Sequence, residues 1–187
     1  MKILTVIFAA ILISSCSTKI IKDQPDANGN FKAVDNSRAA MEHFINGQIL
    51  DAQEKYDDAL VEFEKALEYE KSGGIYYALA VDYLRVNKLY RAKESVSKAI
   101  KKDSLNNDFI FLLASIYESA KSTDSAAVCY EKILKRDSLD VRANVNLAEI
   151  YKVPKPRKAL EIFNKLARIL GPTPEVLFEI ASINEHL

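Results

Sequence analysis

The chain has 187 residues, 49% of them hydrophobic, and its 26 basic residues balance 26 acidic ones. This length suits one domain with a sizeable core, whereas the balanced charge and the lack of a strongly basic block argue against nucleic acid as a partner. Only five glycines and five prolines occur, and no alternating strands separated by hairpin turns are present, which argues against a β fold. The composition therefore predicts an all-α protein.

The first fifteen residues have the layout of a secretory signal peptide. Lys2 precedes an apolar run, and small residues follow it, as in the positive, apolar and cleavage regions of such signals. The run is shorter than the roughly 20 apolar residues that a membrane-spanning helix needs. We therefore expect residues 1–15 to be a signal peptide.

Cys16 follows this segment in the stretch Ile13-Ser14-Ser15-Cys16. A branched residue and two small residues before a cysteine resemble the lipobox of bacterial lipoprotein signals. The resemblance implies cleavage before Cys16 and acylation of its thiol and its new amino group, and more than one acyl chain gives stable anchoring. Ser17 in the next position favours the outer membrane, with the protein facing the periplasm. The alternative is an ordinary signal peptide with a chance cysteine at its end.

Residues 16–37 are predicted to form the lipidated cysteine and a flexible tether. Residues 17–37 show no helical periodicity and are rich in Asp, Asn, Gly, Pro and Ser, as in flexible linkers. A coil of this length has a reach of about 25 Å, which would hold the folded part clear of a bilayer. Asn36 and Ser37 suit the N-cap of the first helix.

From residue 38 onward, small residues recur with a period of 33 or 34. Ala59, Ala92, Ala126 and Ala159 are separated by 33, 34 and 33 residues. Three further sets recur with them: the preceding small residues Gly47, Ala80, Ala114 and Ala148, with Ala181 33 residues further on; the tyrosines Tyr83, Tyr117 and Tyr151; and the large residues Phe63, Val96, Tyr130 and Phe163. Small residues allow helix backbones to cross closely.

The order small-x-x-Tyr followed by Ala-x-x-x-aromatic resembles the tetratricopeptide repeat. The resemblance implies a right-handed superhelical solenoid of about four and a half helix-turn-helix repeats. Their approximate bounds are 38–72, 73–106, 107–140 and 141–173, with a half-repeat at 174–187. Stacked hairpins of this kind bury one continuous core. The fourth repeat has one residue fewer in its internal loop, where Pro154 and Pro156 lie.

Few residues suggest chemistry. His43 and His186 lie at opposite ends of the array, and Cys129, the only thiol after Cys16, falls on a packing face, where a small buried core residue is expected. The sequence contains no Cys-x-x-Cys motif, metal-ligand cluster, nucleophile elbow or Gly-rich phosphate loop. We therefore expect no enzyme, no catalytic or metal site and no cofactor.

The resemblance places a peptide-binding groove on the first helix of each repeat. The positions three residues before the small one, with one neighbour, give Phe44, Tyr77, Val81, Phe111, Val145 and Phe178. The family's clamp for a peptide carboxylate needs lysine here and is absent. An apolar segment could lie along this ladder, beside the acidic residues Asp51, Glu118 and Glu149 and the basic residues Arg85, Arg142 and Lys152. Alternatively, the rings fill gaps between neighbouring helices.

These features favour a membrane-anchored scaffold or adaptor in the bacterial cell envelope, for example in outer-membrane assembly or secretion. Its partners would be other envelope proteins or peptide segments in the groove, and the membrane through Cys16. The alternative is a lipoprotein that captures a small ligand or glycan. Glycan sites usually stack sugars on exposed aromatic rings, often Trp, and the chain has no Trp.

Overall fold

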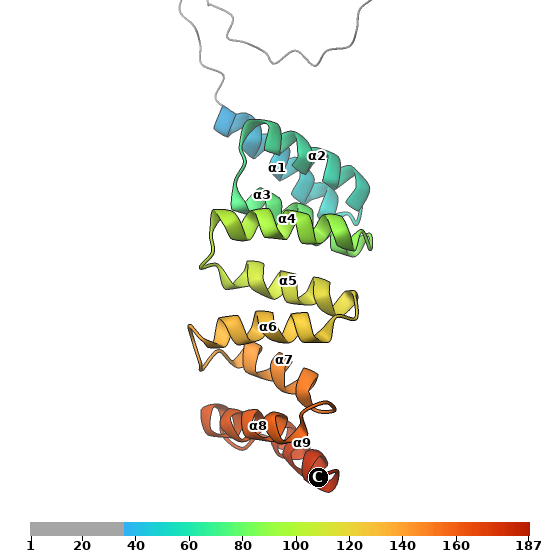
Figure 1. Cartoon of the computed structure of the whole chain (residues 1–187). Helices are drawn as coiled ribbons and strands as arrows, with labels where there is room; N and C mark the ends of the chain where they lie inside the picture. The colour runs from blue at the N-terminus through green and yellow to red at the C-terminus, as the bar shows by residue number, and fades with distance from the viewer. Residues whose placement is uncertain (1–35) are drawn as a thin grey trace, which may run out of the picture. The chain divides into compact units, whose positions relative to one another are not determined.

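A computed structural model describes residues 36–187, which form one compact unit of nine α-helices without a β-strand (Figure 1). The helices are α1 (Asn36–Ala52), α2 (Tyr56–Tyr69), α3 (Gly73–Arg85), α4 (Leu89–Lys102), α5 (Asn107–Ser119), α6 (Thr123–Leu134), α7 (Val141–Tyr151), α8 (Pro156–Leu170) and α9 (Pro174–Glu185). The predicted signal peptide, Cys16 and the tether up to residue 35 lie outside the described residues. The helix begins at Asn36, so residues 36–37 are the start of α1 and not the end of the tether.

The helices pack in chain order as a stack of hairpins. The pairs α1–α2, α3–α4, α5–α6 and α7–α8 form the hairpins, each joined to the next through α2–α3, α4–α5, α6–α7 and α8–α9, and α3 also contacts α5. Figure 1 shows them following one another from the blue α1 to the red α9. We call the odd-numbered helices A helices and the even-numbered ones B helices. Contacts limited to neighbours define a solenoid, so the predicted fold class is confirmed.

The turns inside the first three hairpins share one backbone conformation. Glu54, Asn87 and Lys121 have positive φ angles of 61°, 56° and 57°, and the residue after each donates its backbone N–H to a carbonyl five residues earlier. This left-handed conformation suits Asn better than the other two residue types. The fourth loop, residues 152–155, has no such residue, and Pro156 opens α8 instead.

Small residues stand where the helices cross, as the repeat predicts. The fully buried ones are Ala59, Ala66, Ala80, Ala92, Ala99, Ala114, Ala126, Ala143, Ala148 and Ala159. At Gly47 even a methyl group would not fit, because an added Cβ would lie 2.5 Å from a ring carbon of Phe63. Ala181 differs from its equivalents because it lies exposed on α9.

The core consists of two clusters that meet at α5. Phe109, Leu112 and Ile116 pack with α2, α3 and α4, whereas Phe111 and the opposite face of α5 pack with the helices up to α9. Leu113 contacts both clusters. None of the nine described helices combines the length and the hydropathy that a bilayer crossing requires.

Candidate functional site

The residues predicted to line a groove occupy equivalent positions on the A helices. Three ion pairs join successive repeats along one side of the array: Arg85 with Asp51, Arg142 with Asp108 at 3.8 Å, and Lys152, the residue directly after α7, with Glu179 at 2.7 Å. We call this side the A-helix face. It comprises Phe44, Tyr77, Val81, Phe111, Val145 and Phe178 with the charged residues Asp51, Arg85, Asp108, Glu118, Arg142, Glu149, Lys152 and Glu179.

The charges on this face are largely paired with one another. Lys152 contacts Glu149 at 2.8 Å as well as Glu179, and the Tyr130 hydroxyl donates a hydrogen bond of 2.8 Å to Glu118. Of the charged residues named from the sequence, Asp51 pairs with Arg85 and Glu149 with Lys152. Glu118 is instead bound by a neutral hydroxyl, and Arg142 pairs with Asp108. A face whose charges satisfy each other favours a partner that contributes apolar side chains.

The predicted groove residues occupy regular repeat positions, but their side chains differ in exposure. Phe111 is only 5% exposed, because Tyr130 packs against its ring at 5.9 Å and the Arg142 guanidinium lies 3.9 Å from its centroid. The prediction that Phe111 lines an open groove is therefore wrong. Its ring instead fills the gap between neighbouring helices. Burial of this kind follows from residues on α6 and α7, which the ladder position alone does not reveal.

The other members range from half-buried to open. Phe44 lies 5.6 Å from Phe63, and Tyr77 lies 5.4 Å from Phe109, each between ring centroids. Both residues, with Val81, are partly buried against the first core cluster. By contrast, Val145 is 36% exposed and Phe178 is 70% exposed. The apolar surface of the A-helix face is thus most accessible toward α9.

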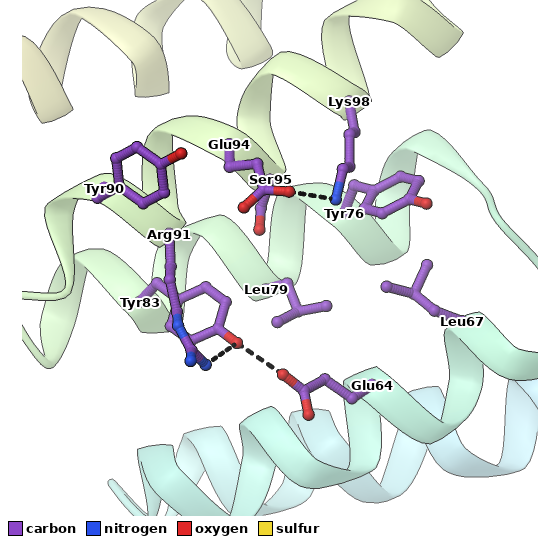
Figure 2. Close-up of a pocket in the computed structure, with 10 residues that line it drawn as sticks. All are labelled: Glu64, Leu67, Tyr76, Leu79, Tyr83, Tyr90, Arg91, Glu94, Ser95 and Lys98. Atoms are coloured by element: carbon purple, nitrogen blue, oxygen red, sulfur yellow. Dashed lines mark hydrogen bonds and ion pairs between the residues drawn. The ribbon is translucent and has the colours of Figure 1, made fainter.

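A cleft that was not predicted lies between α2, α3 and α4 (Figure 2). This cleft has a volume of about 450 Å³ and is lined by Leu79 and three tyrosines, with charged residues from both B helices. The Tyr83 hydroxyl donates to Glu64 at 2.6 Å and accepts from Arg91 at 3.4 Å. Burial raises the pKa of Tyr83, and the hydrogen bond to Glu64 raises it further.

Cations already cover two of the three rings in this cleft. The Arg91 guanidinium lies 5.7 Å from the Tyr83 ring, and the Lys98 ammonium lies 5.8 Å from the Tyr76 ring while it donates to Glu94 at 2.7 Å. Figure 2 shows the third ring, Tyr90, apart from these contacts, and it is 82% exposed. The cleft is therefore polar, internally neutralised and open at a single aromatic ring.

An equivalent cleft lies one repeat further along, between α4, α5 and α6. Its volume is about 320 Å³, and Leu113, Tyr117, Val128 and Cys129 are among its lining residues. Burial raises the pKa of the Cys129 thiol to about 11, so the thiol stays protonated and unreactive near neutral pH. Cys129 is buried, which confirms the predicted structural role. Only the 34-residue spacing of the lining residues could have revealed these two clefts.

A buried carboxyl that the sequence did not single out lies beside the A-helix face. Asp82 on α3 is 1% exposed, and one of its oxygens accepts a hydrogen bond of 3.2 Å from Arg85. Its other oxygen has no partner among the described residues. Burial raises the pKa of Asp82 to about 6. Arg85 also contacts Asp51 and lies 5.1 Å from the Tyr56 ring, so this cluster joins the first two hairpins.

The titratable groups elsewhere make local structural contacts. His43 lies 2.7 Å from Glu62 and stacks on Tyr69 at 5.8 Å. The hydrogen bond from His43 lowers the pKa of Glu62. In residues 36–187, no three His, Cys, Asp or Glu side chains lie close enough to hold a metal ion.

Comparison with known proteins identifies the class to which this fold corresponds. A family model described as tetratricopeptide repeat matches residues 77–127. The curated protein "DnaJ homolog subfamily C member 3 homolog" of Dictyostelium discoideum is 27% identical over 175 residues, which is 89% of this chain. The chain spans 35% of the length of that relative.

Solved structures show the same architecture. A MamA protein matches with a TM-score of 0.69 and 16% identity over 80% of this chain and 82% of that one. YrrB, described as a TPR protein with an unusual peptide-binding site, matches with a TM-score of 0.64 and 16% identity over 83% and 84%. Pseudomonas aeruginosa pilF matches with a TM-score of 0.64 and 25% identity over 79% and 68%.

Together, the fold and these matches define an all-α tetratricopeptide-repeat solenoid. The family model and the structural neighbours support the predicted tetratricopeptide repeat family for this chain. Proteins built from this repeat mediate protein–protein interactions and are generally not enzymes.

Proposed function

We propose that this protein is a lipid-anchored adaptor in the bacterial cell envelope, which holds a partner protein on its A-helix face. Cys16 would carry the lipid, and the repeat array would stand in the periplasm, attached to the outer membrane. Partners would be envelope proteins of an assembly or secretion machine. The observation that carries the binding part of the proposal is the accessible apolar surface of Val145 and Phe178, beside charges that are already paired.

The anchor rests on the N-terminal sequence. The stretch Ile13-Ser14-Ser15-Cys16 after a short apolar run supports lipidation and export. The likeness to the Pseudomonas aeruginosa pilF structure, at 25% identity, is consistent with a bacterial setting. A solenoid on a tether suits an adaptor, because its extended surface can engage a long segment of a partner.

A protein partner is favoured over a glycan by the state of the aromatic rings. Sugar binding needs open ring faces, and Arg91 and Lys98 already cover Tyr83 and Tyr76 in the cleft between α2, α3 and α4. Tyr90 alone leaves its ring open there. On the A-helix face, an extended apolar segment would meet accessible side chains of the kind that concentrate binding energy.

The binding site is tested by photo-crosslinking in intact cells. Benzoylphenylalanine would replace Val145 or Phe178, with Tyr90 on α4 as the matched exposed control. Both A-helix-face positions should form adducts with the same protein, identified by mass spectrometry, and the Tyr90 position should not. Adducts from Tyr90 alone, or no protein adduct from either face position, would contradict the proposed site.

The anchor is tested separately. The variant Cys16→Ala should leave the membrane fraction or accumulate with its signal peptide uncleaved, because no acyl chains can be attached. Metabolic labelling with a palmitate analogue should mark the wild-type chain and not the variant. Wild-type fractionation of Cys16→Ala would remove the anchor from the proposal and leave the A-helix face unaffected.

A further inference from the structure

The cleft between α4, α5 and α6 has an apolar wall, unlike its equivalent between α2, α3 and α4. The side chains that form this wall are Ile100, Ile110, Leu113, Val128 and Cys129, and the other lining residues are Tyr117, Ser125 and Lys132. None of the described residues that line it is acidic. Its volume of about 320 Å³ is at the lower end of the roughly 300–1,000 Å³ of small-molecule sites. The cleft therefore has room for a small apolar ligand.

Tyr117, in this cleft, lacks a hydrogen bond that its two equivalents make. The Tyr83 hydroxyl donates to Glu64, 19 residues earlier, at 2.6 Å (Figure 2). The Tyr151 hydroxyl donates to Glu131, 20 residues earlier, at 2.7 Å. Tyr83 and Tyr151 are both 5% exposed, whereas Tyr117 is only half-buried. The middle tyrosine of the three thus has a hydroxyl that can reach a ligand.

The sequence explains why the acceptor is missing. The residues 19 and 20 positions before Tyr117 are Lys98 and Ser97. The Lys98 ammonium can only donate and is bound to Glu94 at 2.7 Å. The Ser97 hydroxyl donates to the backbone carbonyl of Lys93 at 2.7 Å. A carboxylate that the neighbouring hairpins supply from their own chain is therefore absent here.

The charged groups near Tyr117 are positive. The Lys93 ammonium lies 5.3 Å from the Tyr117 ring, and Lys132 lines the cleft. Neither ammonium belongs to an ion pair within residues 36–187. A hydroxyl donor beside two cations is an arrangement that attracts an anionic oxygen.

We infer that the cleft between α4, α5 and α6 binds a medium-chain aliphatic carboxylic acid. The aliphatic tail lies against the apolar wall, and the carboxylate accepts a hydrogen bond from Tyr117 near Lys93 and Lys132. It takes the role that Glu64 and Glu131 have in the other hairpins. The inference goes beyond the proposed adaptor function, because it uses no residue of the A-helix face and requires neither the lipid anchor nor a protein partner.

The same chemistry, an apolar group that ends in a carboxylate, also occurs at the C-terminus of a peptide. A peptide would bring backbone amides into the cleft, and these need hydrogen-bond partners. The wall offers few, because its aliphatic side chains have none and the Ser125 hydroxyl is already bonded to Ser122 at 2.9 Å. The lining therefore favours the free acid.

The test is isothermal titration calorimetry with octanoate. The protein is the chain without residues 1–16, which keeps the compact unit of residues 36–187 and both core clusters. Octanoate should bind at one site per chain, at least about tenfold more tightly than 1-octanol, which lacks the charge. Butyrate should also bind at least about tenfold more weakly, because its tail buries fewer methylenes. High salt should weaken octanoate binding.

Matched variants locate the site. Tyr117→Phe should weaken octanoate binding by at least about fivefold, because the hydrogen-bond donor is lost. Tyr83→Phe, the same change in the other cleft, should leave it unaltered. Val128→Glu installs the acidic residue that the second hairpin has at this position, Glu94, and should weaken binding by at least about tenfold through repulsion. Because Val128 is 63% exposed, its melting temperature should not change.

Four results would overturn the inference. Octanoate might show no saturable binding, or it could bind no better than 1-octanol, which would remove recognition of the carboxylate. Equal effects of Tyr117→Phe and Tyr83→Phe would place the site elsewhere. Tighter binding of a pentapeptide that ends in leucine would assign the cleft to the C-terminus of a protein. None of these results affects the crosslinking test of the A-helix face.

Discussion

The second and third hairpins share the same packing positions but differ in the polarity of the side chains around them. Their inward positions match, as Leu79 with Leu113 and Tyr83 with Tyr117, each 34 residues apart. At three other positions the second hairpin is polar where the third is apolar: Asp82, Glu94 and Ser95 correspond to Ile116, Val128 and Cys129. The charged Arg91 corresponds to the uncharged Ser125. The cleft of the second hairpin is accordingly a hydrogen-bonded network, and that of the third is mainly an apolar pocket.

This difference shows which positions the repeat fixes. Small residues at the crossings and the large residues beside them must pack for the hairpins to stack. Positions around them tolerate either a polar network or apolar filling, because each hairpin contacts only its neighbours. Individual hairpins can therefore acquire separate surface properties without a change in the fold.

The largest expected difference between the two hairpins is at Phe111 and Tyr77, which hold the same repeat position. Phe111→Ala should lower the free energy of unfolding by about 3–5 kcal/mol, because a buried ring leaves a cavity. Tyr77→Ala should cost clearly less, since Tyr77 is only partly buried. Urea denaturation measures both, and equal losses would contradict the assignment of Phe111 alone to the core.

The next largest effect is expected when the buried carboxyl of Asp82 is replaced by the apolar residue that the third hairpin has at this position. Asp82→Ile installs the residue that the third hairpin has at this position, and at pH 7 it should stabilise the protein by about 1–4 kcal/mol, as replacement of buried charge often does. Arg85 keeps its contact with Asp51, so the substitution leaves no isolated cation.

The pH dependence of this effect follows from the pKa of Asp82. Its pKa rises from 3.8 to about 6 in the folded protein, so the folded state binds the proton more tightly than the unfolded chain does. The favourable contribution of the protonated form is complete below pH 3.8 and is lost as the pH rises through 6. The advantage of Asp82→Ile should therefore grow between pH 4 and pH 6. A constant difference across this range in thermal unfolding would refute the assignment.

The smallest expected effect separates the two tyrosines of the clefts. Tyr83→Phe removes the hydrogen bond to Glu64 and should cost about 0.5–1.5 kcal/mol. Tyr117→Phe should change the stability by less than about 0.5 kcal/mol, because no hydrogen bond from its hydroxyl occurs in residues 36–187. Tyr117 instead has the Lys93 ammonium 5.3 Å from its ring. Indistinguishable melting curves for the two variants would show that the polar network contributes no stability.

Much of the fold was predictable because the repeat is defined by side-chain size at fixed positions. The spacing of Ala59, Ala92, Ala126 and Ala159 placed the hairpins, and each of these alanines is fully buried. The burial of Cys129 followed from the same register. These predictions succeeded because close helix crossings allow little choice of side chain.

The candidate site was less predictable, because exposure depends on neighbours from other helices. Phe111 and Phe178 hold one repeat position, yet Tyr130 and Arg142 cover the first and no described helix covers the second. The burial of Asp82 was not predicted, because a carboxylate on a helix is usually exposed. The left-handed turns at Glu54 and Lys121 were also unexpected, since neither residue type favours that conformation.

The division of the core at α5 has a consequence for biogenesis. A chain that leaves the ribosome, or a translocation channel, from its N-terminus presents the complete first cluster once Ile116 has emerged. Contacts between sequence neighbours require only short loop closures and form quickly. The first half can therefore fold before the second half has been delivered, and the exposed face of α5 then serves as the template on which α6 and the later helices assemble.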